Sequence, residues 1–184
     1  MKYMLAAGLF MMASICLAQT PPAEAEAKPE AAAPTPAAAR VTATDAILMS
    51  DVVPYAEGSK IPVEVLQECT ALGRQLADST EKYGKENGVS LVRAAAVDPA
   101  KGGQVLVLRI VSVLSARSMM AHNKSVAIRA ELYKDGQLVS DYSPSRNSGG
   151  GVLGPYQSSC SVLERTVNTL GSDIARWLKG VVSR

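Results

Sequence analysis

The alternation of apolar and polar positions from Ala46 onward predicts a series of β-strands. Three short apolar runs rich in strand-forming residues lie at Ala46–Val53, Val89–Ala94 and Val105–Leu114. The third run is apolar at both alternating sets of positions, which is typical of a central strand covered on both faces. Residues Ser125–Tyr133 alternate strictly, and Asp135-Gly136 separates them from another extended run at Leu138–Tyr142. These two runs therefore predict a β-hairpin.

Two other segments carry apolar residues at intervals of three and four, the spacing of amphipathic helices. The first segment starts at Pro62, a residue favoured in the first helical turn, and ends at Asn87-Gly88. The second starts near Ser161 and Glu164, which are spaced as in a capping box, and runs toward the C-terminus. We expect Tyr55–Lys60 to form a turn and Ser143–Tyr156 a glycine-rich loop.

The order of these elements predicts an α/β (α+β) fold with a mixed sheet of about five strands. The first strand–helix–strand unit should be a right-handed parallel crossover. The remaining strands should be antiparallel, because a hairpin dominates the second half of the domain. Two helices should pack mainly on one face of the sheet.

The N-terminus has the pattern of an export signal. Lys2 precedes an uncharged apolar run that ends at Leu17, and small residues at positions 16 and 18 precede Gln19. We expect residues 1–18 to be a cleavable signal peptide, residues 19–40 a disordered Ala/Pro/Glu-rich tail and residues 41–184 a single α/β domain. The run is too short to span a bilayer comfortably, so we expect no membrane span after processing. The mature chain should be periplasmic or secreted.

Cys16 leaves lipoprotein anchoring open as an alternative. Ala13 and Ile15 do not fit the usual residues before a lipidated cysteine, so simple cleavage after Ala18 fits better. Cleavage would remove one of three cysteines and leave Cys69 and Cys160. An isolated pair in an oxidising compartment usually forms one disulfide. The alternative is two buried free thiols.

Candidate interaction residues occur on one strand and in the loop that follows the hairpin. Arg129, Glu131 and Tyr133 share one strand face, with Arg109 possible alongside them on the neighbouring strand. They predict either a polar binding strip or a solvated face whose opposite charges pair. The loop from Ser143 to Gly154 is long and polar, as partner-binding loops often are. It adds further candidates at Arg146, Gly149, Gly150 and Gly151.

Cofactor and metal chemistry have weak support in the sequence. Residues 149–154 contain G-x-G-x-x-G, but they follow a hairpin strand rather than the strand of a parallel crossover, so we expect no dinucleotide cofactor. His122, the only histidine, could bind Cu(I) with Met119 and Met120, but no third ligand is evident. No group of residues has the pattern of a catalytic site, so we assign none.

The charge balance excludes one class of partner. The chain has a net charge of +2 and no basic block. A nucleic-acid-binding protein needs a clustered cationic face. We therefore expect no nucleic-acid partner.

The C-terminal third resembles a known family. Residues 125–139 (SVAIRAELYKDGQLV), residues 145–154 (SRNSGGGVLG), residues 159–165 (SCSVLER) and the terminal DIARWL are similar to a bacterial exported family, domain of unknown function 4410. The resemblance implies a small envelope α/β domain, and no functional residue transfers from it. We interpret the chain as a non-catalytic envelope module that binds a protein or envelope component. The alternatives are an exported hydrolase with an unrecognised site and a metal-handling protein.

Overall fold

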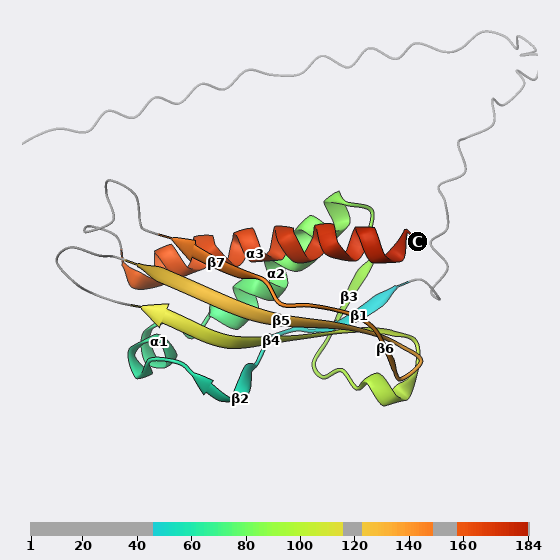
Figure 1. Ribbon diagram of the computed structural model, residues 1–184, viewed down its shortest axis with the longest axis horizontal. Helices are drawn as coiled ribbons and strands as arrows, with labels where there is room; N and C mark the ends of the chain where they lie inside the picture. The colour runs from blue at the N-terminus through green and yellow to red at the C-terminus, as the bar shows by residue number, and fades with distance from the viewer. Residues whose placement is uncertain (1–45, 116–122, 149–157, 184) are drawn as a thin grey trace, which may run out of the picture. The chain divides into compact units, whose positions relative to one another are not determined.

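The computed structural model describes residues 46–115, 123–148 and 158–183. Within these ranges the chain forms one seven-stranded mixed sheet and three α-helices (Figure 1). The elements in chain order are β1 (Ile47–Ser50), β2 (Tyr55–Lys60), α1 (Val63–Glu68), α2 (Leu72–Glu86), β3 (Leu91–Ala94), the 3-10 turn η1 (Pro99–Lys101), β4 (Gln104–Ser115), β5 (Lys124–Lys134), β6 (Gln137–Tyr142), β7 (Ser145–Ser148) and α3 (Ser159–Val182).

The strand pairing confirms the predicted fold class. The sheet has the order β3-β1-β4-β5-β6, with β2 also paired to β4 and β7 also paired to β5. Strand β1 runs parallel to β3 and β4, and β2 runs parallel to β4. Strand β5 is antiparallel to β4, β6 and β7. The parallel half and the antiparallel half therefore meet at β4.

The sheet has two more strands than the sequence predicted. Strand β2 occupies the segment expected to be a turn, and β7 lies inside the segment expected to be a loop. Their sequences, YAEGSK and SRNS, have no apolar alternation. Both are short and contain no buried residue, so no buried side chains impose the period of two that identifies a strand. The expectation of a turn and a continuous loop there was wrong.

The β5–β6 hairpin is formed by the residues that predicted it. Asp135 and Gly136 connect the strands with φ values of 50° and 81°, the left-handed conformations that a two-residue hairpin turn of type I′ requires. Asp135 also binds the start of β4, since the Gly103 N–H donates to Asp135 Oδ1 over 2.9 Å. The Asp135 N–H in turn donates to the Gly103 carbonyl over 2.9 Å. The turn is thus held to β4 as well as closing the hairpin.

The first helical segment is broken rather than continuous. Helix α1 ends at Glu68 and α2 starts at Leu72, with Cys69 as the C-cap of α1 at φ −107° and ψ 46°. Because of the break, Leu66 is exposed instead of continuing the buried stripe of α2. The second predicted helix, α3, begins at Ser159, slightly before the start near Ser161 that the sequence predicted. Its N-cap is Ser158, whose side chain accepts a hydrogen bond from the Ser161 N–H.

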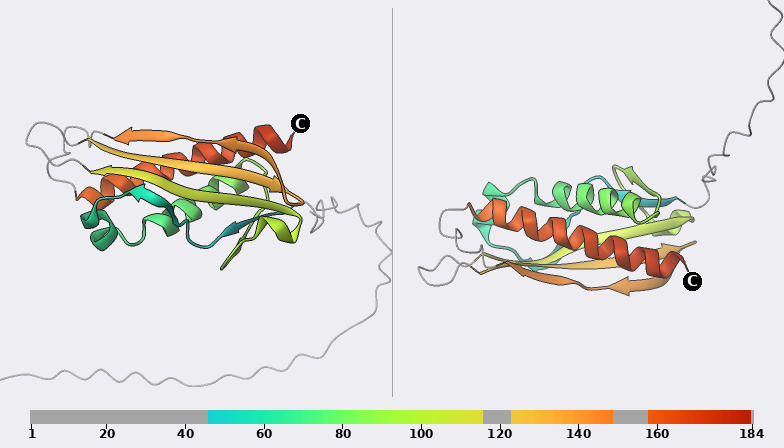
Figure 2. Two further views of the ribbon diagram at one scale, coloured as in Figure 1. Left: turned by 60° about the horizontal axis from the view of Figure 1, so that its bottom comes forward. Right: turned by 90° about the horizontal axis from the view of Figure 1, so that it is seen from above.

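The core lies between the sheet and the α2–α3 pair, which pack side by side on one face (Figure 2). Strands β4 and β5 contribute alternate residues to it, and α3 contributes one stripe. The fully buried residues of the α3 stripe are Leu163, Val167, Leu170, Ile174 and Leu178. The predicted packing of helices on one face is therefore present.

Helices α2 and α3 approach each other closely at Gly171. A Cβ atom there would lie 2.4 Å from Ser79 Oγ and 2.8 Å from the Ser79 carbonyl carbon. The Ser79 hydroxyl lies within hydrogen-bonding distance of three carbonyl acceptors, those of Gln75 and Leu76 in its own helix and, at 3.3 Å, that of Val167 in α3. A glycine and a satisfied small hydroxyl therefore set the distance between the helices.

A disulfide joins Cys69 and Cys160, the pair that the cysteine count predicted. Their Cα atoms are 5.3 Å apart, and 91 positions separate them in the sequence. Cys69 lies at the α1–α2 break and Cys160 in the first turn of α3. The bond therefore ties the start of α3 to the junction between the first two helices.

Candidate functional site

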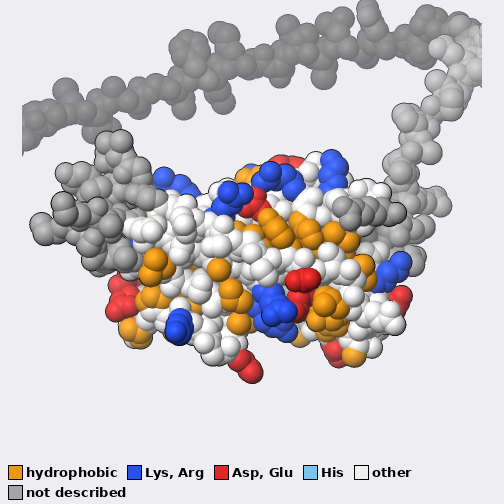
Figure 3. All heavy atoms as spheres, viewed as in Figure 1, with side chains coloured by type: hydrophobic (Ala, Val, Ile, Leu, Met, Phe, Trp, Pro, Cys, Tyr) orange, Lys and Arg blue, Asp and Glu red, His pale blue; other side chains and the backbone are white. Residues whose placement is uncertain are grey.

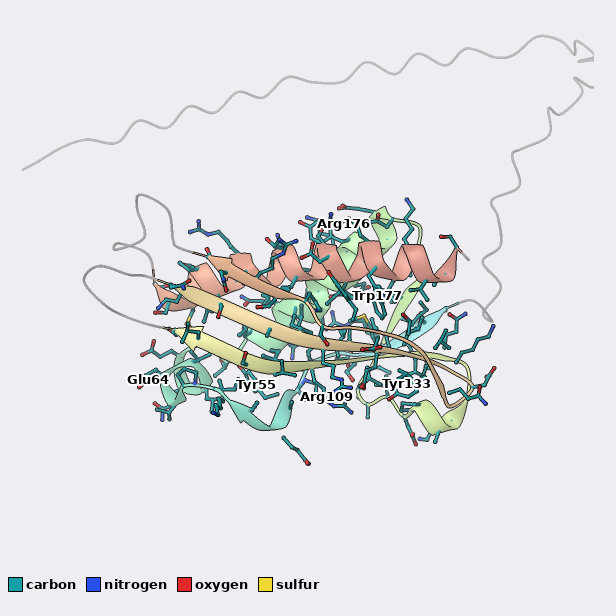
Figure 4. All side chains as sticks on the ribbon, viewed as in Figure 1. Tyr55, Glu64, Arg109, Tyr133, Arg176 and Trp177 are labelled. Carbon is teal, nitrogen blue, oxygen red and sulfur yellow. A yellow bond between two sulfur atoms is a disulfide. The ribbon has the colours of Figure 1, made fainter. Side chains whose placement is uncertain are left out.

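The face of β4 and β5 opposite α2 and α3 carries a cluster of charged side chains built around Glu131. Residues Ile128, Ala130 and Leu132 of β5 enter the core, so Arg129, Glu131 and Tyr133 point to the other side. Figure 4 shows Arg109 and Tyr133 on this side of the sheet, away from α3. We call this side of β4 and β5 the open face, because no α-helix of the described residues packs on it.

Glu131 is the centre of the open-face cluster. Its side chain is only 10% exposed, whereas the side chains of Arg109 and Arg129 are about half exposed. Arg109 Nη1 donates to Glu131 Oε2 over 2.9 Å, and Arg129 Nε lies 2.9 Å from Oε1. The Tyr133 hydroxyl donates to Oε2 over 3.4 Å. One mostly buried carboxylate thus holds two arginines, and these three charged groups together carry a net charge of +1. Asp141 of β6, paired across the strands with Glu131, lies on the same face.

A row of apolar side chains crosses the open face beside the Glu131 cluster. Residues paired directly across neighbouring strands lie on the same face of a sheet. The pairs that form the row are Val92 with Leu48, Leu48 with Val105, Val105 with Tyr133, and Tyr133 with Leu138. Val105 is buried, but Leu48, Val92 and Leu138 are exposed. Figure 3 shows charged and hydrophobic side chains next to each other on this side of the sheet.

A second cluster of the same kind lies between β7 and α3, around Asp173. The Asp173 side chain is 3% exposed, and Arg146 binds both of its oxygens, Nε to Oδ2 over 2.6 Å and Nη2 to Oδ1 over 2.9 Å. Arg176 Nη2, one helical turn along α3, also donates to Oδ1. The hydrogen bonds and then the charge of Asp173 raise the pKa of the Arg146 guanidinium. This cluster also has a net charge of +1.

The structure therefore divides the candidate interaction residues between two faces. Arg129, Glu131 and Tyr133 are together on the open face, and Arg109 joins them as the strand pattern suggested. Arg146 is not with them: it pairs with Val126, a core residue, and so faces α3. Gly149, Gly150 and Gly151 lie outside the described residues, as do Met119, Met120 and His122.

A third charged cluster surrounds Arg93 of β3. Arg93 Nη1 lies 2.5 Å from Asp78 Oδ1 and 3.4 Å from Glu81 Oε2, and Nε lies 3.6 Å from Asp51 Oδ1. Burial lowers the pKa of Arg93, but hydrogen bonds and charges from Asp78 and Glu81 outweigh it and the pKa is raised. One arginine here joins β3, α2 and the end of β1, an arrangement that stabilises the fold.

The described surface has a hollow beside α2 and α3 and another beside the disulfide. The larger, about 480 Å³, lies between the outer sides of α2 and α3. It is lined by Gln75, Asp78, Ser79, Lys82, Ser161, Glu164, Arg165 and Asn168. The smaller, about 290 Å³, lies beside the disulfide and includes Glu64, Glu68 and Ser115. The lining of neither hollow contains a histidine or a free cysteine in the part of the chain that is described.

Sequence reasoning missed the partners of Arg146. Asp173 and Arg176 lie three positions apart on α3, the spacing that places two residues on one side of a helix. This spacing predicts an ion pair within the helix, but no pattern in the sequence predicts that β7 packs against Asp173 and Arg176.

In residues 46–115, 123–148 and 158–183, no group of three or more His, Cys, Asp or Glu side chains is arranged to hold a metal ion. No helix in these ranges is both long and apolar enough to cross a bilayer.

Comparisons with known proteins give structural neighbours but no family. No family model matches the chain, so the resemblance to domain of unknown function 4410 is not confirmed, and no curated protein matches it.

Several solved structures are similar to the chain. The chain is similar to the PelC dodecamer from Paraburkholderia phytofirmans, with 13% identity over 70% of this chain and 86% of that one and a TM-score of 0.46. It is also similar to lipoprotein GNA1162 from Neisseria meningitidis, with 19% identity over 71% and 98% and a TM-score of 0.44. A third is a minor lipoprotein from Acinetobacter baumannii, with 13% identity over 74% and 94% and a TM-score of 0.40. The chain is thus similar to bacterial proteins, two of which are lipoproteins.

Proposed function

We propose that this chain is a non-catalytic module of the bacterial cell envelope that binds a protein partner with an acidic surface through the open face of β4 and β5. The observation that carries the proposal is the Glu131 cluster, in which one mostly buried carboxylate fixes two half-exposed arginines. The export signal expected at residues 1–18 supports an envelope location. The Cys69–Cys160 disulfide fits an oxidising compartment.

The charge of the cluster determines the chemistry of the partner. Glu131 is covered by its neighbours, so a partner meets the guanidinium groups of Arg109 and Arg129 before it meets the carboxylate. Arginine presents five N–H donors in a planar fork, and each of these two arginines uses one N–H for the hydrogen bond or ion pair to Glu131 described above. The remaining donors suit carboxylates, which arginine binds in pairs of parallel hydrogen bonds.

The exposed apolar residues beside the cluster give the same surface an apolar part. Leu48 and Val92 lie on one side of Tyr133 and Leu138 on the other. Protein interfaces commonly combine a tyrosine or arginine with neighbouring apolar contacts that exclude water. Because Glu131 already fixes the two arginines, their side chains lose less entropy when a partner binds.

Charge reversal on the open face tests the proposal. The tagged full chain would capture proteins from the envelope of the producing bacterium, and the affinity of each purified candidate would then be measured by calorimetry. We expect Arg129→Glu to weaken binding about tenfold or more, because it removes a charged hydrogen-bond donor and repels an acidic partner. The matched control is Arg74→Glu, on an exposed position of α2, which should bind like the wild type.

A second pair of variants tests the apolar part of the surface. Leu138 is 50% exposed on β6, and Val182 is 49% exposed at the end of α3. Leu138→Asp should weaken binding while Val182→Asp does not, because only Leu138 belongs to the open face. Circular dichroism would verify that all variants fold. Equal affinity of the wild type, Arg129→Glu and Leu138→Asp for every captured protein would refute this function.

A further inference from the structure

The Asp173 cluster on the other side of the sheet has more positive charge than its buried carboxylate needs. Arg146 alone binds both oxygens of Asp173 through two donors, which already pairs this acid completely. Arg176 adds a second guanidinium at the same Oδ1. Since both Nη2 atoms meet one oxygen, the two like charges are close neighbours. An incoming anion would neutralise the excess.

The two arginines are also accessible, whereas the acid is not. The side chain of Asp173 is almost fully buried, that of Arg146 is about half exposed, and that of Arg176 is more exposed still. A ligand therefore meets two guanidinium groups with fixed positions. This arrangement differs from a surface salt bridge, in which both partners face water.

Strand β7 supplies the second feature of this surface. Among the described residues β7 pairs only with β5, so its other edge has no strand beside it. Figure 2 shows β6 and β7 along the outer side of β5, near α3. An edge strand presents unpaired backbone N–H and C=O groups to which an extended peptide can add. Residues of such a peptide would alternate between the two faces, and every second one would point toward the Arg146 side.

We infer that Arg146 and Arg176, held by Asp173, bind a carboxylate of an acidic peptide segment that lies extended along β7. The backbone of the segment pairs with the edge of β7. Its acidic side chains on the α3 side reach the two arginines. The inference does not rest on the open face, because it concerns other residues on the opposite side of the sheet.

Trp177 gives a direct readout for this site. It is the only tryptophan of the chain, it follows Arg176 on α3, and its ring stacks on Tyr142 of β6 with centroids 5.6 Å apart. Figure 4 shows Arg176 and Trp177 both on α3. Because Trp177 directly follows Arg176, we expect a peptide that binds Arg176 to change the fluorescence of Trp177.

The test uses the full chain and two blocked peptides, one of alternating threonine and glutamate and one of alternating threonine and glutamine. We expect a saturable change of Trp177 fluorescence with the glutamate peptide, about tenfold weaker binding of the glutamine peptide, and binding that weakens as salt is added. Arg176→Gln should weaken binding of the glutamate peptide about tenfold. It should still fold, because Arg146 keeps both oxygens of Asp173 paired. Arg74→Gln, which removes one positive charge from α2, is the matched control.

Several outcomes would overturn the inference. One is no saturable change, or equal affinity for the two peptides. Another is an equal effect of Arg176→Gln and Arg74→Gln. If inorganic phosphate or vesicles of phosphatidylglycerol bound through Arg176 while the glutamate peptide did not, the site would be one for phosphate groups and the peptide assignment would be wrong. The comparison of the two peptides uses only the wild-type chain and so does not depend on the folding of any variant.

Discussion

The Cys69–Cys160 disulfide should provide a large part of the stability of this domain. The bond links positions 91 residues apart, so in the reduced, unfolded chain a long segment gains freedom. The chain-entropy treatment gives about 4–5 kcal/mol for a loop of this length. Domains of this size are stable by about 5–15 kcal/mol in total, so reduction should remove about a quarter or more of the free energy of unfolding.

Urea unfolding of the oxidised and the reduced chain measures this effect. The urea dependence of the free energy of unfolding is about 2 kcal/mol per molar for a domain of this size, so reduction should lower the midpoint by about 2 M. Trp177 fluorescence and far-UV circular dichroism would follow the transition. Reduction should also increase the urea dependence itself, because the unfolded chain without the crosslink exposes more surface.

Two variants separate the crosslink from other effects. Cys16→Ser removes the third cysteine and should leave the oxidised midpoint unchanged. The Cys69→Ala and Cys160→Ala double variant should be slightly less stable than the reduced wild type, because Cys69 is buried and its sulfur atom also fills space in the core. A midpoint that stays within about 0.5 M of the oxidised value after complete reduction would refute the loop-entropy argument.

Three further predictions concern stability. Gly171→Ala should lower the free energy of unfolding by about 1–3 kcal/mol in urea titrations, since its methyl group would overlap Ser79, whereas an unchanged midpoint would contradict the tight approach of α2 and α3. Glu131→Gln should destabilise by about 1–2 kcal/mol, because Arg109 loses its charged acceptor, and stability equal to wild type would contradict the cluster geometry. Burial raises the pKa of Tyr55, so its contribution should be complete below pH 10 and lost as the pH rises through the higher folded pKa. Tyr55→Phe should therefore reduce the loss of stability between pH 9 and pH 11, and identical pH profiles would disprove this.

The sequence predicted the elements whose side chains face the core. The alternation in β5 and the apolar run of β4 identified the two central strands, and Asp135-Gly136 identified the hairpin because the turn requires left-handed conformations. The edge strands β2 and β7 escaped prediction because their sequences follow no buried face. These two segments are strands because β2 pairs with β4 and β7 pairs with β5. The local sequence pattern does not reveal such pairing.

The break between α1 and α2 could not be predicted for a different reason. No glycine or proline lies between Glu68 and Leu72, so local sequence favours a continuous helix. The disulfide lies at the break and joins it to the first turn of α3. A contact between segments 91 residues apart is tertiary information, and it overrides a helical preference that a short window supports.

The candidate site was predicted only as far as one strand determines it. The period of two places Arg129, Glu131 and Tyr133 on one face, and that part agrees with the structure. The role of Glu131 as the centre depends on Arg109, which belongs to another strand, and the position of Arg146 depends on α3. Both clusters combine residues from different elements. The sequence shows which residues are charged, but it does not show which of them come into contact.

The common plan of the two clusters allows binding to be separated from folding. In each, a hidden carboxylate is paired with more than one arginine, Arg109 and Arg129 at Glu131 and Arg146 and Arg176 at Asp173. Removing one arginine leaves the acid paired, so stability should change little, whereas a partner loses a charged donor. Removing the acid instead leaves two arginines close together without their common partner. The free energy of unfolding and the affinity for the partner should then both decrease. If the arginines served only the fold, variants of Arg129 and Arg176 would lose stability and leave every binding measurement unchanged.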